Sequence, residues 1–380
     1  MTGIDSRAGS PDDPIAVVGG GIAGASVAYH LSRYGDRPVV VYERGAIAAE
    51  TTARSTAVYR VMGDPVLGPM KRYGLSLLNE VAAEPTANPW FELIGRFEVA
   101  TSEEGADALR GDDLATGTYL AGEDLHRTAF APGLRTGDVV GARYNPNAGY
   151  LRPAEVAHEF VERARSNGVE VVTNTPVADV ILEDGSARAI ETETDTRAVS
   201  HVVAAAGPWN RQIGRLVGLD LPVRHTLAPI ARLDAGESLV HTLPNVKHQE
   251  SGYYLVGRRG GSVLVGHSPG SYQEAGTEYD PDRVGESVPA EVRSGMIDAV
   301  ERFVPSILAA GIEEEWVGVR SLTPDGRPMV GPTGVDGFSL VAFNSEGIQL
   351  APAAGLVIAS HLGDADPPAY ADAVSPRRFD

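Results

Sequence analysis

The first forty residues alternate between short apolar runs and a glycine-rich turn. Residues 15–18 (IAVV) are all apolar and end at Gly19, which predicts a buried parallel strand. Residues 22–34 then have helical character, and residues 38–43 predict a second strand that ends in an acid. Strand, glycine loop, helix and strand in this order predict a βαβ unit.

The rest of the chain shows both periodicities, which predicts a mixed α/β fold. Residues 153–167 predict a helix, because Val156, Phe160 and Ala164 repeat every four residues. Residues 253–256 and 262–265 have strand character and are joined through the glycine-containing stretch 257–261, which predicts a hairpin.

The glycines of the first turn match the GxGxxG pattern at Gly19, Gly21 and Gly24. In that pattern the glycines permit a tight turn, close approach of a pyrophosphate, and close packing of helix on strand. Glu43 follows Gly19 by 43 − 19 = 24 residues, about where an acid binds the ribose hydroxyls. The motif in this context predicts dinucleotide binding, but by itself it does not separate NAD from FAD.

Composition narrows the possible functions. The chain has 380 residues, a formal charge of −19 and no cysteine. The negative charge argues against nucleic-acid binding, which requires a basic face. The lack of cysteine excludes disulfides, thiolate metal sites and a flavin bound through cysteine. The nine histidines form no metal-binding motif, so we predict no metal.

The distribution of apolar residues also shows no transmembrane helix and no signal peptide. No window has the ~20 apolar residues of a transmembrane helix. Residues 1–13 are polar and lack a signal-peptide core, so we expect a disordered leader and a cytoplasmic protein.

Four later blocks resemble the D-amino acid oxidase-like (DAO) superfamily of flavoproteins: residues 51–57, 202–209, 318–331 and 344–349. The resemblance implies FAD as cofactor and a Rossmann-like FAD-binding domain interleaved with a mainly antiparallel β-sheet substrate domain. By this resemblance, residues 14–90, 150–220 and 318–380 would form the FAD-binding domain. Residues 91–149 and 221–317 would form the substrate-binding domain.

Within the superfamily, residues 21–26, 54–55, 347–349 and 375–378 are similar to the D-arginine dehydrogenases of bacteria, and the chain also resembles glycine and sarcosine oxidases. The implied reaction is FAD-dependent oxidation of a carbon–nitrogen bond, in a D-amino acid or a related secondary amino acid. A quinone, a dye or oxygen would accept the electrons. The alternative is a tailoring flavoenzyme of specialised metabolism that oxidises a larger amine or a carrier-bound aminoacyl group.

The motifs and the resemblance together assign most of the cofactor site. The expected cofactor-binding residues are Gly19, Gly21, Ile22, Ala23, Gly24, Glu43, Arg44, Thr52, Arg54, Ser55, Thr56, Ala57, Val177, Ala206, Gly207, Trp209, Arg320, Asn344, Ser345, Glu346, Gly347, Ile348 and Gln349. Val58 stands where some relatives attach FAD through a histidine. With no cysteine either, the FAD should be non-covalent.

The resemblance also suggests four residues for substrate chemistry. Arg320 would bind the substrate carboxylate, or form a salt bridge within the FAD-binding domain. Tyr254 would bind the carboxylate or amine, or pack within its strand. Glu98 would face a cationic substrate side chain, or lie exposed on a strand. Arg60 would anchor an anion, or lie on the surface of an altered lid.

One further position concerns the electron acceptor. Leu264 stands where sarcosine oxidases place a lysine whose charge favours reaction with oxygen. A leucine cannot supply that charge, so we expect a dehydrogenase rather than an oxidase.

Overall fold

The computed structural model describes residues 10, 12–82, 91–114, 116–127, 134–236, 243–268, 270–273, 275, 280–285 and 287–380. The leader expected at residues 1–13 lies mostly outside these ranges. Within them the strands form four sheets.

The first sheet has a parallel core that begins with the glycine-loop strand. Its order is β19-β20-β13-β1-β2-β9, and only the β19–β20 pair is antiparallel. Its strands are β1 (Ile15–Val18), β2 (Val39–Tyr42), β9 (Glu170–Val172), β13 (His201–Ala204), β19 (Met329–Pro332) and β20 (Phe338–Ala342). All four residues of β1 are buried because both faces of this sheet are covered.

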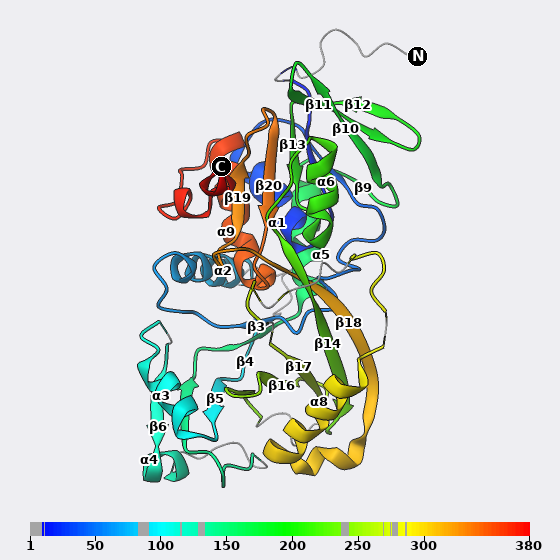
Figure 1. Ribbon diagram of the computed structural model, residues 1–380. Helices are drawn as coiled ribbons and strands as arrows, with labels where there is room; N and C mark the ends of the chain where they lie inside the picture. Colours follow the sequence, from blue (N-terminus) through cyan, green and yellow to red (C-terminus); the bar gives the residue numbers. More distant parts are fainter. Residues whose placement is uncertain are drawn as a thin grey trace.

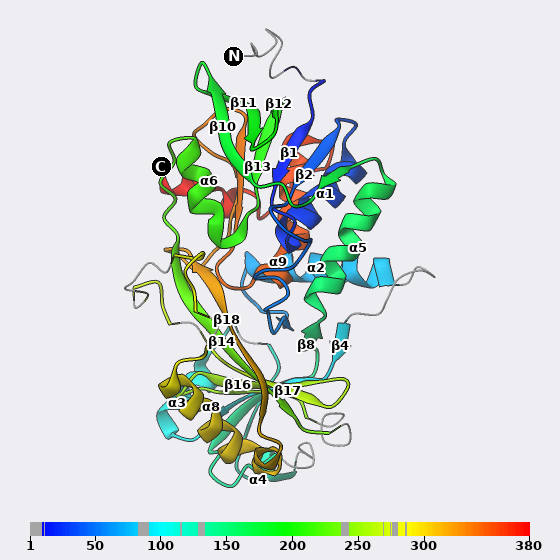
Figure 2. The same ribbon diagram turned by 90° about the vertical axis from the view of Figure 1, so that its right-hand side faces the viewer.

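Helices cover one face and a small sheet covers the other (Figures 1 and 2). Ile15 and Val17 pack with the helices, whereas Ala16 and Val18 pack with the small sheet. The helices are α1 (Ile22–Tyr34), α2 (Leu67–Ala82), α5 (Pro153–Ser166) and α9 (Gly347–Leu362). On the other side lie β10 (Val177–Glu183), β11 (Ser186–Thr192), β12 (Thr196–Ala198), η1 (Gly207–Trp209) and α6 (Asn210–Leu216).

The second large sheet has eight strands in the order β18-β14-β17-β16-β15-β5-β7-β6. Every neighbouring pair is antiparallel except β15 with β5. The strands are β5 (Arg96–Ala100), β6 (Thr118–Ala121), β7 (Gly141–Asn145), β14 (Arg224–Asp234), β15 (Asn245–His248), β16 (Tyr253–Arg258), β17 (Ser262–His267) and β18 (Ile312–Leu322). Figure 2 shows β14 and β18 rising from this sheet toward the six-stranded one.

The two faces of the eight-stranded sheet have different surroundings. Leu255, Val263 and Val265 pack with α8 (Ala290–Phe303) on one face, in a hydrophobic core. Tyr254 and Leu264 alternate with them and point to the other face. The remaining elements are α3 (Glu103–Gly111), α4 (Gly122–Arg127), α8 (Ala290–Phe303), η2 (Pro305–Ala310), η3 (Asp372–Val374), η4 (Pro376–Phe379), and the sheet of β3 (Val58–Tyr59), β4 (Phe91–Leu93) and β8 (Gly149–Leu151).

The mixed α/β class predicted from the sequence is confirmed. Helix α1 has the predicted bounds, and α5 ends one residue before the predicted Asn167. The division into FAD-binding and substrate-binding segments stays a prediction. Its boundary at residue 318 falls inside β18, which runs without interruption from Ile312 to Leu322.

Candidate functional site

A cavity of about 670 Å³ lies between the carboxyl ends of β1, β2 and β13 and the face of the eight-stranded sheet that carries Tyr254. Its volume is in the range of cofactor and ligand sites. Most of the wall comes from five stretches of chain, and single residues of other strands complete it. The five stretches are residues 18–23, 42–60, 205–213, 318–321 and 343–349.

The glycine loop lies at one end of the cavity, and two of its positions have no room for a side chain larger than that of glycine. Gly19 has a φ of +115°, and a Cβ on it would lie 2.6 Å from the carbonyl oxygen of Ala205. A Cβ on Gly24 would lie 1.8 Å from the carbonyl oxygen of Gly19. Gly24 does not line the cavity. It lets α1 approach the loop, which is the packing role expected for the third glycine.

Glu43, at the end of β2, is buried beside the glycine loop. Its Oε2 accepts a hydrogen bond from the Gly20 amide at 2.6 Å, and its Oε1 accepts one from the Gly45 amide at 2.8 Å. A carboxylate oxygen has more than one lone pair, so both oxygens can still accept bonds from a ribose. The backbone thus holds the carboxylate in the position where the motif requires it.

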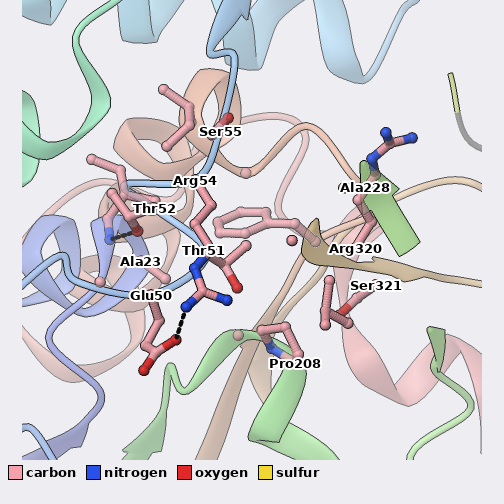
Figure 3. A pocket seen from close by; sticks show the side chains of 18 of the residues that line it. Ala23, Glu50, Thr51, Thr52, Arg54, Ser55, Pro208, Ala228, Arg320 and Ser321 are labelled. Carbon is pink, nitrogen blue, oxygen red and sulfur yellow. Dashed lines mark hydrogen bonds and ion pairs between the residues drawn. The ribbon is translucent and has the colours of Figure 1, made fainter. Parts of the chain in front are cut away.

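The loop after β2 lines the cavity, and Figure 3 shows side chains of this loop, among them Glu50, Thr52 and Arg54. Thr52 Oγ1 accepts a hydrogen bond from the Ile22 amide at the start of α1, at 3.0 Å. Arg54 points toward Glu50, with 3.8 Å between Nη2 and Oε2. Ala23, Glu50 and Thr52 lie on one side of the close-up view, and Arg320 lies on the other.

A third group of side chains, Arg44, Trp209 and Asp282, lies where the end of β2 approaches η1. Arg44 stacks on Trp209, with its Cζ 3.9 Å from the ring centroid. Asp282 Oδ1 accepts hydrogen bonds from Arg44 Nη1 at 3.0 Å and from Trp209 Nε1 at 2.6 Å. These contacts join the end of β2 to η1, next to the wall residues Val177, Ala206 and Gly207.

The residues just before α9 and at its start, 343–349, line another part of the cavity wall. Ser345 has a φ of +64° and donates its amide to the Ser321 carbonyl at 2.9 Å. Ala48 and Ala57, also in the wall, likewise have positive φ values of 60° and 46°. Backbone strain of this kind gathers at ligand sites. Glu346, the N-cap of α9, pairs with Lys71 at 2.8 Å.

Arg320 has a guanidinium that is only partly satisfied. Its Nη2 donates to the His267 carbonyl at 2.5 Å. Its Nη1 is buried and has no partner among the described residues. Burial lowers the pKa of Arg320, and the nearby Tyr254 opposes that shift. Tyr254 also lines the cavity, with its hydroxyl 3.3 Å from Thr56 Oγ1.

A charged cluster lies beyond Tyr254. Glu98 Oε1 is 2.8 Å from Arg96 Nη2 and 3.4 Å from Arg60 Nη1. Burial alone would raise the pKa of Glu98, but Arg96, Arg60 and Lys247 lower it to about 2. Arg60, Arg96 and Lys247 line the cavity, whereas Glu98 lies behind them.

The structure therefore brings together nearly all the residues expected from the sequence. Every expected cofactor-binding residue except Gly24 lines the cavity, as do Arg320, Tyr254 and Arg60. Glu98 differs from the expectation, because its carboxylate pairs with Arg96 and Arg60 and does not line the cavity. Sequence reasoning missed Arg96 and Lys247, whose positions depend on strand pairing.

These features fit an FAD molecule. An acid at the end of β2, glycines at the start of α1 and a long cavity suit the adenosine and pyrophosphate. The start of α9 lines the cavity, as does Arg320, whose buried Nη1 has no partner among the described residues. Among the described residues no three His, Asp or Glu side chains are arranged to hold a metal ion.

A Rossmann-type βαβ unit joined to a largely antiparallel sheet over a cavity of this size fits a flavin-dependent oxidoreductase. The chain belongs to the FAD dependent oxidoreductase (DAO) family, because that family's model matches residues 14–361. FAD is accordingly the cofactor, as predicted.

Individual relatives are more distant. The chain is 28% identical to glycine oxidase of Bacillus subtilis over 360 residues, which cover 90% of both chains. It is 26% identical to mitochondrial dimethylglycine dehydrogenase of Rattus norvegicus over 389 residues, covering 96% of this chain but 44% of that protein. The chain thus spans less than half the length of that relative.

Solved structures support the fold. The chain superposes on L-proline dehydrogenase from P. horikoshii with a TM-score of 0.83 and 21% identity, covering 97% of this chain and 98% of that one. In the described part of our chain, no helix has both the length and the apolar character needed to cross a membrane.

Proposed function

We propose that the protein oxidises the carbon–nitrogen bond of an amino acid, either a D-amino acid or a related secondary amino acid. The observation that carries this proposal is the buried Nη1 of Arg320, which has no partner among the described residues. An unsatisfied buried donor costs ~1–3 kcal/mol, and more on a charged group. A substrate carboxylate can satisfy it, and a guanidinium binds carboxylates in a fixed orientation.

The surrounding residues support the orientation of such a substrate. With its carboxylate on Arg320, the substrate lies against Tyr254, whose hydroxyl can hydrogen-bond the amine. Thr56 holds that hydroxyl from the cofactor-side loop at 3.3 Å. Bound FAD supplies the hydride acceptor. The role of this chain is to fix the α-carbon and to exclude other orientations.

The atoms balance as a two-electron oxidation. The α-carbon loses a hydride, and the neutral amine contributes its lone pair to form the C=N bond. The proton on nitrogen leaves to a water molecule or to Tyr254. Hydrolysis of the imine then gives an oxo acid and ammonia, or an oxo acid and a primary amine when the substrate amine is secondary. If the hydride leaves the N-alkyl carbon of a secondary amine instead, hydrolysis gives the dealkylated amino acid and a carbonyl compound. A quinone, a dye or oxygen removes the electrons, and a cytoplasmic location remains part of the proposal.

The test mixes FAD-loaded protein with candidate substrates in the absence of oxygen. We expect D-amino acids or secondary amino acids to bleach the yellow absorbance of the oxidised flavin. For Arg320→Met, we expect a strongly raised KM for carboxylated substrates but little change for amines that lack the carboxylate.

The matched control is Arg302→Met. Arg302 lies on α8, which packs on the opposite face of the eight-stranded sheet. Both arginine variants lose one positive charge. If Arg320→Met affected amines with and without a carboxylate equally, Arg320 would have a structural role. If no amino acid bleached the flavin, the proposed function would be wrong.

A further inference from the structure

The chain contains only two lysines, Lys71 and Lys247. Lys247 lines the cavity beside Arg60 and Arg96, at what we call the inner end, whereas Lys71 lies behind the wall. Lys71 is fully buried and paired with Glu346. Lys247, on β15, is half-buried in the cavity wall. Its ammonium has no hydrogen-bond or ion-pair partner among the residues that the structure describes. Desolvating a cation without a partner is costly, so its position in the wall points to an anionic ligand.

Strand pairing fixes where Lys247 lies. It is directly opposite Tyr254 on β16 and directly opposite Glu98 on β5. Directly opposed residues share one face of a sheet, and in an antiparallel pair such as β15 and β16 their Cβ atoms are ~4.5–5.5 Å apart. The strand of Tyr254 lies between that of Lys247 and those of the Arg320 side. Arg320 and Lys247 therefore lie on opposite sides of Tyr254.

Glu98 is the strongest favourable charge acting on Lys247, but it offsets only part of the positive charge at this end of the cavity. Its Oε1 already contacts both Arg96 and Arg60. Arg60, Arg96 and Lys247 thus surround a single carboxylate. A cationic substrate side chain would meet these three cations before it reached Glu98, which argues against the role first considered for that residue.

The other charged groups nearby do not cancel the positive charge of Arg60, Arg96 and Lys247. Lys71 and Glu346 neutralise each other behind the wall. Asp64 and Asp112 act on the pKa values of Lys71 and Lys247, respectively, but less strongly than Glu346 and Glu98 do. The inner end of the cavity keeps a surplus of positive charge.

Extending the function proposed above, on which this inference rests, we propose that the substrate is a dicarboxylic amino acid. Its α-carboxylate binds Arg320, and its second carboxylate binds Lys247 and Arg60 on the other side of Tyr254. A substrate with an uncharged side chain would leave Lys247 unpaired, and one with a cationic side chain would be repelled.

The first test measures binding without catalysis. Malonate, succinate and glutarate have no amine and cannot be oxidised, so their affinity for FAD-loaded protein can be measured by calorimetry. Acetate, propionate and butyrate are the matched monocarboxylates. We expect at least one dicarboxylate to bind about 10- to 100-fold more tightly than its partner, as a charge-assisted hydrogen bond would give.

Variants test whether the difference in affinity between dicarboxylates and monocarboxylates depends on Lys247. Lys247→Met should remove the preference for dicarboxylates, and Lys247→Arg should keep most of it. Arg302→Met, on the opposite face of the sheet, should leave the preference unchanged. Equal loss of dicarboxylate and monocarboxylate binding in Lys247→Met would overturn the proposal, as would dicarboxylates that bind no better in the unaltered protein.

The scarcity of lysine provides an independent readout. Lys71 is 0% exposed, so among the lysines reductive methylation should modify Lys247 first. We expect the bound dicarboxylate to protect Lys247 from methylation, as measured by peptide mass spectrometry, and monocarboxylates at equal concentration to protect it much less. Unprotected Lys247 in protein saturated with dicarboxylate would refute the proposed contact.

Turnover separates this inference from the proposed function. Aspartate, glutamate and iminodiacetate are compared with alanine, norvaline and sarcosine in the anaerobic bleaching assay. Dicarboxylate binding through Lys247 without bleaching by any amino acid would support the anion site and refute the function. Bleaching by alanine and aspartate with equal KM would support the function and refute the dicarboxylic substrate.

Discussion

The ion pair of Lys71 and Glu346, behind the cavity wall, should stabilise the folded protein. Lys71 is 0% exposed, and its Nζ lies 2.8 Å from Glu346 Oε2 and 3.3 Å from Met62 Sδ. Lys71→Met removes the charge with a side chain of similar length. It leaves Glu346 as a carboxylate without its main partner at the start of α9.

The magnitude follows from burial. Removing one partner of a buried ion pair costs ~3–5 kcal/mol. The side chain of Glu346 is 25% exposed, so water relieves part of this cost and the lower end applies. An unfolding entropy of ~2.1 cal/mol/K per residue gives about 0.8 kcal/mol/K for this chain, so a loss of about 3 kcal/mol lowers the Tm by about 4 °C.

The assay is thermal unfolding of the FAD-free and FAD-loaded forms. Lys71→Met should melt about 4 °C below the unaltered protein. The double variant Lys71→Met/Glu346→Gln should recover most of the loss, because no unpaired charge remains. The reasoning fails if Lys71→Met melts like the unaltered protein, or if the double variant melts no higher than the single one.

Three further predictions concern the cofactor. Glu43→Ala should weaken FAD binding by about 2–4 kcal/mol, measured from flavin fluorescence on dilution, because charge-assisted hydrogen bonds to the ribose are lost; an unchanged Kd would place the ribose elsewhere. Acid precipitation should release all flavin into the supernatant, since Val58 provides no attachment point and the chain has no cysteine; yellow colour in the pellet would contradict this. Reduced enzyme should react slowly with air-saturated buffer in a stopped-flow instrument, because Leu264 is buried in an apolar cluster. Rapid formation of hydrogen peroxide would refute that expectation, and its loss in Lys247→Met would identify the responsible charge.

The cofactor half of the site could be predicted because its signals are local in sequence. Gly19, Gly21 and Glu43 lie in one βαβ unit, where strand, turn and helix follow each other without long-range choices. The observed α1, Ile22–Tyr34, has the predicted bounds. Arg320 and Ser345 could be located because each belongs to a recognisable block.

The substrate half could not be predicted in the same way. Strand alternation tells that Arg96 and Glu98 share a face, but not which strand lies beside them. The neighbour is β15, about 150 residues later in the chain, and its pairing with β5 is the one parallel step in the sheet. Glu98 and Lys247 become neighbours only through that pairing. Without it, Glu98 is a lone acid free to be matched with a cationic substrate.

Composition nevertheless contained an unused signal. Of 32 basic residues, two are lysine, so 32 − 2 = 30 are arginine. Many of those arginines form exposed ion pairs, such as Arg110 with Asp107 and Arg165 with Glu162, which contribute little to stability. The two lysines instead lie in the interior, one paired with Glu346 and one in the cavity wall. A compact ammonium carries its charge on one atom, so it fits beside a single carboxylate where a planar guanidinium needs more room. In a chain that uses arginine almost everywhere else, each lysine is therefore a candidate for a specific carboxylate partner. For Lys71 that partner is in the protein, and for Lys247 we expect it in the substrate.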